Sequence, residues 1–152
     1  MDYKQFFGRE SIVVAPDLIG RFLSRKTEKG SICARMMETA AYENGSETPS
    51  RAGMKYSPGR LFLMPYRGSD LFNIATDIEG FPSCVEIRKL LFMDDIINGS
   101  GVITEFLGLN SSFDGIPLGK EIRILGERVR HIKHSTELEM PDNCVGYFSI
   151  NP

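Results

Sequence analysis

Apolar and polar residues alternate along two neighbouring segments near the N-terminus, residues 21–27 and 31–42. Such alternation is typical of half-buried strands, and Gly30 lies in the turn between them, so the two segments predict a β-hairpin. In the longer segment, a period of two places on one face Ile32, Ala34, Met36, Glu38, Ala40 and Tyr42. The opposite face carries Cys33, Arg35, Met37, Thr39 and Ala41.

Further alternating or short apolar segments predict strands at residues 59–66, 83–92, 120–129 and 143–150. Pro65 has no backbone N–H to donate, so it confines the first of these strands to a sheet edge or a bulge. In the second, the period of two places Glu86 and Arg88 on one face.

Two segments carry the signals of short helices. Residues 12–20 contain Pro16, which suits a first turn, and end at Gly20, which suits a C-terminal cap. Residues 100–109 place apolar side chains at helical spacing between Ser100, a candidate cap, and a terminating glycine at position 108.

Residues 43–60 are rich in Gly, Ser, Pro and Thr, which predicts a loop. Strands and helices that do not alternate regularly are typical of the α+β class. We therefore expect one α+β domain over residues 1–152, with a few short helices around a curved antiparallel sheet or partial barrel.

Composition narrows the class of protein. The 41% hydrophobic and 25% charged residues are typical of a globular chain and exclude a disordered one. No apolar run approaches the roughly 18 residues of a membrane span, and the charged N-terminus does not resemble a signal peptide, so we expect an intracellular protein. Three scattered cysteines and two histidines without a Cys-x-x-Cys spacing predict reduced, mostly buried thiols and no metal or cofactor.

Charge is distributed unevenly along the chain. Residues 1–67 hold eleven Lys and Arg against seven Asp and Glu, whereas residues 68–127 hold four against ten. Residues 48–69 contain no acidic residue, and their cations are Arg51, Lys55, Arg60 and Arg67. Interleaved with aromatic residues such as Tyr66, these cations indicate an edge that contacts phosphates, although solvated loop arginines are the plainer alternative.

Seven sequence blocks, in this order, resemble the alkyladenine (3-methyladenine) DNA glycosylase family: LIGRFLSRK, ARMMETAAY, TPSRAGM, SPGRLFL, RGSDLFNIA, CVEIRKL and GSGVITEFLGLNSSFDG. The resemblance implies a fold related to the C-terminal domain of methionyl-tRNA formyltransferase. It also implies base-excision repair, in which a hairpin intercalates into double-stranded DNA and a damaged purine is flipped into a pocket. One activated water then hydrolyses the N-glycosidic bond without a metal.

The resemblance can be carried over residue by residue. Where the family strand reads Glu-Thr-Glu-Ala-Tyr, this chain reads Glu38-Thr39-Ala40-Ala41-Tyr42. The second Glu is the family's general base, so Ala40 stands at its position, while Tyr42 retains the aromatic residue that stacks on the flipped base. The following loop is shorter than in the family and lacks the His that packs on the base.

Other positions follow from the same resemblance. Two tyrosines, one lining the pocket and one wedged into the duplex, fall on Met64 and Arg67, with Tyr66 as a candidate substitute wedge. Asn73 stands where a pocket Asn is expected, and Arg88 matches an Arg that helps hold the catalytic water. The expected DNA-binding residues are Arg51, Lys55, Arg60, Tyr66 and Arg67.

Loss of a general base lowers the rate of an enzyme by roughly 10²–10⁴-fold. Glu38 is a candidate substitute on the same strand face, but it lies about 7 Å from Ala40 along the strand. Glu43, Glu47 and Asp70, in predicted loops, are further candidates.

Three hypotheses follow, and in all of them we expect a monomer. The expected partner is double-stranded DNA with a damaged purine, or RNA or a protein under the third hypothesis. The first is a divergent damaged-purine glycosylase. The second is a catalytically silent relative that binds damaged bases or a nucleotide through Tyr42. The third is an RNA- or protein-interaction module on the same fold. Plainer structural roles also stay open, since Tyr42 could close a core and Arg88 could pair with Glu86 or Glu38.

Overall fold

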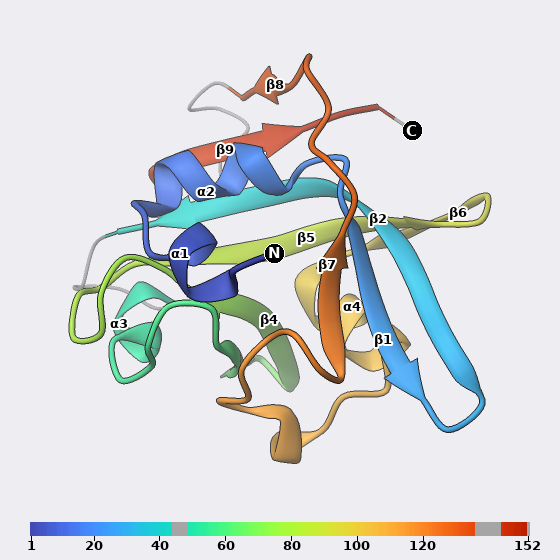
Figure 1. Ribbon diagram of the computed structural model, residues 1–152, viewed down its shortest axis with the longest axis horizontal. Helices are drawn as coiled ribbons and strands as arrows, with labels where there is room; N and C mark the ends of the chain where they lie inside the picture. The colour runs from blue at the N-terminus through green and yellow to red at the C-terminus, as the bar shows by residue number, and fades with distance from the viewer. Residues whose placement is uncertain (44–48, 136–143, 152) are drawn as a thin grey trace.

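Two long antiparallel strands, β2 (Gly30–Tyr42) and β5 (Cys84–Phe92), form the centre of the computed structural model, which describes residues 1–43, 49–135 and 144–151 (Figure 1). The other strands are β1 (Phe22–Thr27), β3 (Leu61–Tyr66), β4 (Ser69–Ala75), β6 (Asp95–Asn98), β7 (Ile122–Leu125), β8 (Lys133–His134) and β9 (Gly146–Ser149). The helices are α1 (Tyr3–Phe7), α2 (Ser11–Leu18), α3 (Ser50–Gly53) and α4 (Ser100–Phe106), with one 3-10 turn, η1 (Ser111–Phe113).

These strands form one curled sheet in the order β3-β4-β5-β2-β1-β7, and every pairing in the described chain is antiparallel. In addition, β6 pairs with β5, β9 pairs with β2, and β8 pairs with β9. The predicted α+β class with a curved antiparallel sheet is therefore confirmed, as is the hairpin of β1 and β2. No helix in the described ranges has the length and apolar character needed to cross a membrane.

Helices α2 and α4 pack against the sheet and build the main core. Leu18 of α2 and Ile103 of α4 are fully buried in this core, beside Phe72 of β4. The hydroxyl of Thr39 in β2 donates to the carbonyl of Ala15 at 2.8 Å and fixes α2 to the sheet. On the opposite face of β2 lies a second, smaller cluster, which comprises Ala40, Tyr42, Phe62, Met64, Ala75 and Cys84.

The prediction that one face of residues 31–42 runs unbroken from Ile32 to Tyr42 is wrong, because β2 changes face near Glu38. Met36 packs in the main core together with Ala41, whereas Tyr42 lies in the second cluster. The register is irregular at this point, where Glu38 pairs with Lys89 out of step with its neighbours. A bulge of this kind increases the local twist and redirects the side chains that follow it.

The predicted helix starts were partly wrong. Pro16 lies inside α2, two residues before its end, although Gly20 does follow the C-cap with φ of +89°, as expected of a terminating glycine. Ser100 is the first residue of α4 and not its cap. Its hydroxyl instead accepts from the amide of Phe72 at 2.6 Å, which joins α4 to β4.

Several elements were absent from the sequence prediction, among them α1, α3, β4, β6 and η1. The segment 43–60 contains the one-turn helix α3, so it is not all loop. Strand β4 was missed because both of its faces are buried: Phe72 and Ile74 point into the main core, and Asn73 between them is also fully buried. A strand buried on both faces shows no hydrophobic alternation.

We expect Gly20→Ala to destabilise the protein by about 2–3 kcal/mol, the sum of positive-φ strain and overpacking. A Cβ at this position would lie 2.5 Å from Val129 Cγ1 and 2.9 Å from the Val129 amide nitrogen. Gly108 has φ of +67° and no atom within 4 Å of a built Cβ, so Gly108→Ala is the control and costs about 1 kcal/mol. Urea unfolding measures both values, and equal losses would contradict the close packing at Gly20.

Candidate functional site

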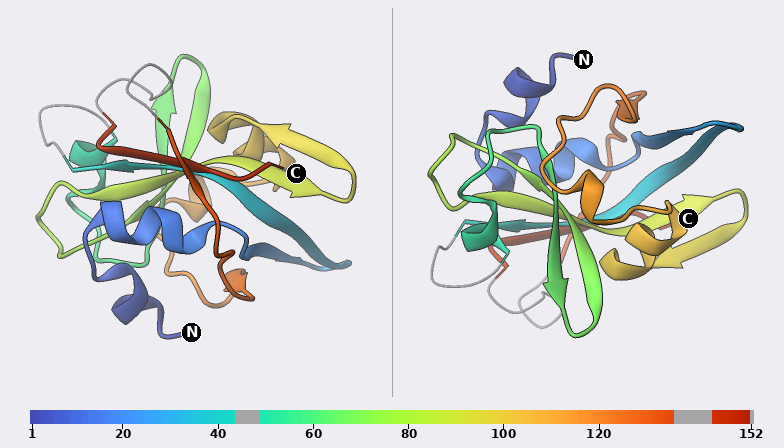
Figure 2. Two further views of the ribbon diagram at one scale, coloured as in Figure 1. Left: turned by 90° about the horizontal axis from the view of Figure 1, so that it is seen from above. Right: turned by 90° about the horizontal axis from the view of Figure 1, so that it is seen from below.

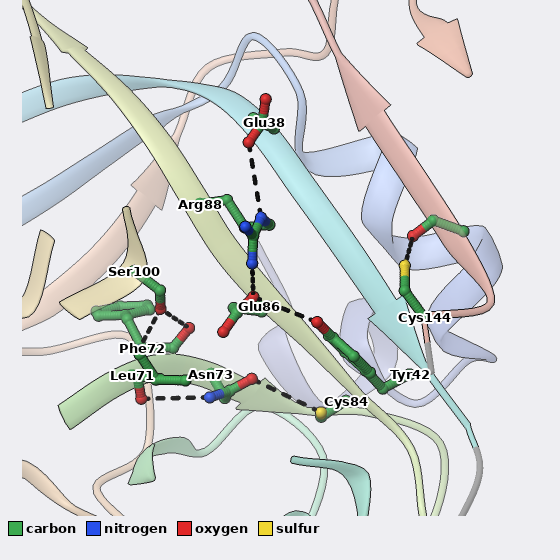
Figure 3. A network of polar contacts seen from close by, with 11 residues as sticks. Glu38, Tyr42, Leu71, Phe72, Asn73, Cys84, Glu86, Arg88, Ser100 and Cys144 are labelled. Carbon is green, nitrogen blue, oxygen red and sulfur yellow. Dashed lines mark hydrogen bonds and ion pairs between the residues drawn. The ribbon is translucent and has the colours of Figure 1, made fainter. Parts of the chain in front are cut away.

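Buried charged and hydroxyl groups form a chain across β5 and β2, on the side of the second cluster (Figure 3). Arg88 Nη1 donates to Glu86 Oε1 at 2.5 Å, and Arg88 Nε lies 3.6 Å from Glu38 Oε2. Lys89 Nζ lies 3.5 Å from Glu38 Oε1. The Tyr42 hydroxyl makes a long hydrogen bond of 3.5 Å to Glu86 Oε1. Glu86 is only 2% exposed and Glu38 only 7%, so both carboxylates depend on these partners for compensation.

The surroundings set the charge state of each member. Burial raises the pKa of the Glu86 carboxyl, and the charge of Arg88 offsets part of that effect. Burial, with a further contribution from Glu86, raises the pKa of Tyr42, so this hydroxyl stays protonated and donates. Burial lowers the pKa of Arg88, but Glu86 more than reverses the effect, so the guanidinium stays charged.

Ala40 belongs to a row of paired residues that crosses five strands. The row runs from β9 to β3 through Tyr147, Ala40, Glu86, Asn73 and Phe62. Directly paired residues point to the same side of a sheet, with Cβ atoms about 5 Å apart. Ala40 therefore has a carboxylate as its neighbour on one side and a tyrosine on the other.

The small side chain of Ala40 allows its neighbours to meet above it. The Arg88 guanidinium carbon lies 5.9 Å from the centre of the Tyr147 ring, although β5 and β9 lie on opposite sides of β2. Arg88 Nε is buried and has no hydrogen-bond partner among the described residues. The cluster thus holds a donor that a water or a bound ligand can satisfy.

A hollow of about 400 Å³ adjoins this cluster. Its lining includes Glu38, Lys89, Lys133, Tyr147, Ser149 and Asn151. Burial raises the pKa of Tyr147, and its hydrogen bond to Glu38 raises it further, so this hydroxyl also stays protonated. The volume lies in the range of small-ligand sites, and the lining offers cations, hydroxyl groups and a carboxylate.

The structure brings several of the predicted site residues to one face. Tyr42, Asn73, Glu38 and Arg88 belong to the contacts drawn in Figure 3. Ala40 pairs with Glu86, a member of the same network. Ala40 is completely buried, however, and Tyr42 is only 5% exposed. The stacking role of Tyr42 therefore stays a prediction that requires the side chains packed on this ring to move.

The other predicted pocket residues have identifiable contacts. Met64 is buried in the second cluster, as core filling requires. Asn73 donates to the Leu71 carbonyl at 3.2 Å and accepts from the Cys84 thiol.

The two loop carboxylates that the structure describes, Glu43 and Asp70, are not paired with Ala40. Glu43 accepts hydrogen bonds from the Ser11 hydroxyl at 2.9 Å and the Ile12 amide at 3.3 Å, so it is fixed to the start of α2. Asp70 lies at the exposed end of β4, and Glu47 lies outside the described residues.

The β3–β4 hairpin stands clear of the body of the domain (Figure 2). Its two turn residues, Arg67 and Gly68, have φ of 49° and 81°, which is the geometry of a two-residue hairpin turn. Tyr66 precedes the turn and is 48% exposed, with the Arg67 guanidinium 5.1 Å from its ring centre. The hairpin therefore presents an aromatic ring and a cation at its tip.

The other predicted DNA contacts differ in how they are held. Arg51 and Lys55 are exposed, and the Lys55 ammonium lies 5.1 Å from the centre of the Tyr56 ring. Arg60 instead donates to the Gly115 carbonyl at 2.6 Å and to Ser57 at 3.1 Å. Its guanidinium holds a loop, so its role in DNA binding stays a prediction.

The described residues include no group of three or more His, Cys, Asp or Glu side chains close enough to hold a metal ion. All three cysteines are free thiols, as predicted, but only Cys84 is buried, while Cys144 is half-buried and Cys33 is exposed.

Sequence reasoning missed two members of the site. Glu86 was identified only as a partner for Arg88, because its place opposite Ala40 depends on the register between β2 and β5. Tyr147 lies in a strand near the C-terminus, beyond the blocks that carried the resemblance, and no sequence signal connected it with Ala40.

Comparison with known proteins finds one matching family model and several similar proteins. The sequence model of the methylpurine-DNA glycosylase (MPG) family matches residues 5–139. A relative from Borrelia garinii subsp. bavariensis is 29% identical over 166 aligned positions, covering 97% of this chain and 86% of the relative. One from Borreliella burgdorferi is 27% identical over the same shares. One from Desulfitobacterium hafniense is 32% identical over 96 positions, covering 56% and 47%. All three carry the name "Putative 3-methyladenine DNA glycosylase".

We expect Arg88→Met to destabilise the protein by about 2–3 kcal/mol at pH 7.5, because it leaves Glu86 and Glu38 buried without this cation. The loss should shrink as the pH falls toward 5. The pKa of Glu86, already raised by burial, rises further without Arg88, so the folded variant gains stability when this carboxyl takes up a proton. Urea unfolding at several pH values measures both effects.

Arg128→Met is the matched control, since Arg128 makes an exposed ion pair with Asp17 and its loss costs less than about 1 kcal/mol. Equal losses in the two variants, or a loss at Arg88 that does not vary with pH, would contradict the dependence of the buried carboxylates on Arg88.

Proposed function

The chain belongs to the methylpurine-DNA glycosylase family, and we propose that it hydrolyses the N-glycosidic bond of a damaged purine flipped out of double-stranded DNA. The observation that carries this proposal is the buried pair of Glu86 and Arg88 beside Ala40 and the hollow of about 400 Å³. This is the region where the resemblance expects the water-activating machinery.

DNA binding is assigned to the hairpin tip and its neighbouring cations. Tyr66 fills the space that the flipped nucleotide leaves in the duplex, and Arg67, Arg51 and Lys55 contact phosphates. Extruding a base costs a few kcal/mol, least for a damaged base, and insertion of an aromatic ring offsets part of that cost.

The extruded nucleotide enters the hollow beside Tyr147. Lys89 and Lys133 line this hollow and supply positive charge for its phosphate. Arg88 Nε, a buried donor with no hydrogen-bond partner among the described residues, orients the attacking water. Ala40, Tyr42, Met64 and Asn73 form the packed layer next to this machinery and do not line the hollow itself.

The charge balance of the site favours substrates that develop positive charge at the sugar. The guanidinium of Arg88 is matched by two buried carboxylates, Glu38 and Glu86, so it does not repel a cationic transition state. Purines that already carry a positive charge, such as N3-methyladenine and N7-methylguanine, leave without needing a proton. Neutral lesions such as hypoxanthine need a proton donor as well.

The protein should release N3-methyladenine and N7-methylguanine from methylated duplex DNA in a single-turnover assay, with no detectable release of hypoxanthine. The reason is that the proposed site supplies buried carboxylates beside the sugar but no proton for the departing base. Cationic purines leave without such a proton, whereas hypoxanthine needs one. Robust hypoxanthine release would contradict the restriction to cationic lesions. No release from methylated DNA would overturn the proposed activity.

A second candidate function is binding of damaged bases without hydrolysis, which is favoured by Ala40 at the position where the resemblance expects the general base. The same assay distinguishes it, combined with a fluorescence titration of lesion-containing duplex, undamaged duplex and RNA. Preference for the lesion duplex without base release identifies a binder, and preference for RNA identifies an RNA-interaction module.

We expect Tyr66→Ala to weaken binding to lesion-containing duplex about tenfold, because stacking on an exposed ring contributes about 1–3 kcal/mol. Phe22→Ala is the matched control: Phe22 is 39% exposed and also lies beside a guanidinium, that of Arg35, but on β1. Fluorescence anisotropy measures both affinities. Equal weakening by the two variants would contradict a specific role for the hairpin tip.

A further inference from the structure

We propose that Glu86 is the general base of this site, so that the carboxylate expected on β2 at position 40 is supplied by the neighbouring strand β5. This inference rests on the proposed function and adds the residue that takes the proton from water.

Glu86 is the residue paired with Ala40 across β2 and β5. Their Cβ atoms are thus about 5 Å apart and point to the same side of the sheet. An alanine leaves empty the space that a longer side chain would fill, and the Glu86 carboxylate can occupy that space from one strand away. On the other side of Ala40 lies Tyr147, which lines the hollow.

The other candidate substitutes in the described residues, Glu38, Glu43 and Asp70, are not paired with Ala40. Glu38 lies one row along β2, about 7 Å from the row of Ala40, and is held by Arg88 and Lys89. Glu43 is hydrogen-bonded to the first residues of α2, and Asp70 lies at the exposed end of β4.

The contacts of Glu86 suit a base that is held in one position. Arg88 Nη1 and the Tyr42 hydroxyl both bind Oε1, so among the described residues these two donors leave Oε2 to accept a proton (Figure 3). Burial raises the pKa of this carboxyl, which makes it a stronger base than an exposed glutamate, and the charge of Arg88 opposes that rise and favours its ionised form.

The reaction balances with these groups alone. The oxygen of one water forms a bond to C1′ of the deoxyribose, and its proton passes to Glu86 Oε2. The bond between C1′ and N9 breaks, and its electron pair leaves with the purine. The products are the free base and an abasic sugar with a hydroxyl group at C1′.

The pH dependence follows from the groups that face Glu86. These are Tyr42 and Glu38 on β2, Cys84 and Arg88 on β5, and Cys144 next to β9. Burial raises the pKa of the tyrosine and of both cysteines, so these three groups stay protonated at neutral and acidic pH. The rate of base release should therefore fall in acid as the Glu86 carboxylate takes up a proton. Because its pKa is raised, this fall should occur at a pH above the ordinary pKa of glutamate.

The test is single-turnover release of base from methylated duplex by the natural protein and by Glu86→Gln, Glu86→Asp and Glu105→Gln, each across pH. Glu86→Gln should lower the rate at least 100-fold and abolish the acid limb. Glu86→Asp should lose less and keep the limb. Glu105 is exposed on α4, so Glu105→Gln should match the natural protein. Circular dichroism and urea unfolding verify the fold of each variant.

A second variant tests the exchange between strands directly. Ala40→Glu combined with Glu86→Gln returns a carboxylate to β2 and should be at least tenfold faster than Glu86→Gln alone. If Glu86→Gln fails to fold, Glu86→Asp becomes the deciding variant. Full activity of Glu86→Asp with an unchanged pH profile then overturns the proposal.

The outcomes separate this inference from the proposed function. No release by the natural protein overturns both. Release by the natural protein that persists within threefold in folded Glu86→Gln, with the same acid limb, overturns the role of Glu86 alone. A folded double variant no faster than Glu86→Gln also contradicts the exchange.

Discussion

Two carboxylates buried on one face of the central strands depend on the positive charge of Arg88. Removing a carboxylate from water costs several kcal/mol, and attraction to a well-placed cation compensates for that cost. Arg88 contacts both Glu86 and Glu38, while Lys89 contributes a second cation to Glu38. The irregular pairing at Glu38 and Lys89 turns β2 so that Glu38 lies on the same side as Arg88. Local backbone geometry and electrostatics therefore support the same site.

The size of Ala40 is as important as the charges around it. Because its side chain is one methyl group, Arg88 and Tyr147 approach each other above β2, and Glu86 is its direct neighbour. A long side chain at this position would separate these groups. In the proposed mechanism Ala40 and Glu86 act as one unit, because the small side chain on one strand leaves room for the carboxylate of the next. Buried polar groups of this kind often reduce stability in favour of function.

Much of the fold could be predicted from the sequence, because β1, β2 and β5 show alternation and Gly20 marks the end of α2. What could not be predicted depends on tertiary structure. Strand β4 is buried on both faces and so shows no alternation, and Pro16 is tolerated near the end of α2 despite its missing N–H. The grouping of Tyr42, Arg88 and Glu38 was accessible from the resemblance. The place of Glu86 beside Ala40 was not, since the register between strands far apart in sequence is decided by packing.

The most direct test of this account is a crystal structure of the protein bound to duplex DNA that contains a cationic pyrrolidine analogue of the abasic sugar. The account predicts that the analogue is extruded into the hollow beside Tyr147. Its charged nitrogen, which stands for C1′ in the transition state, should lie within hydrogen-bond reach of the Glu86 carboxylate, directly or through one water. An analogue that stays within the duplex, or that binds with Glu86 still sealed from it by Arg88 and Tyr42, would contradict the account.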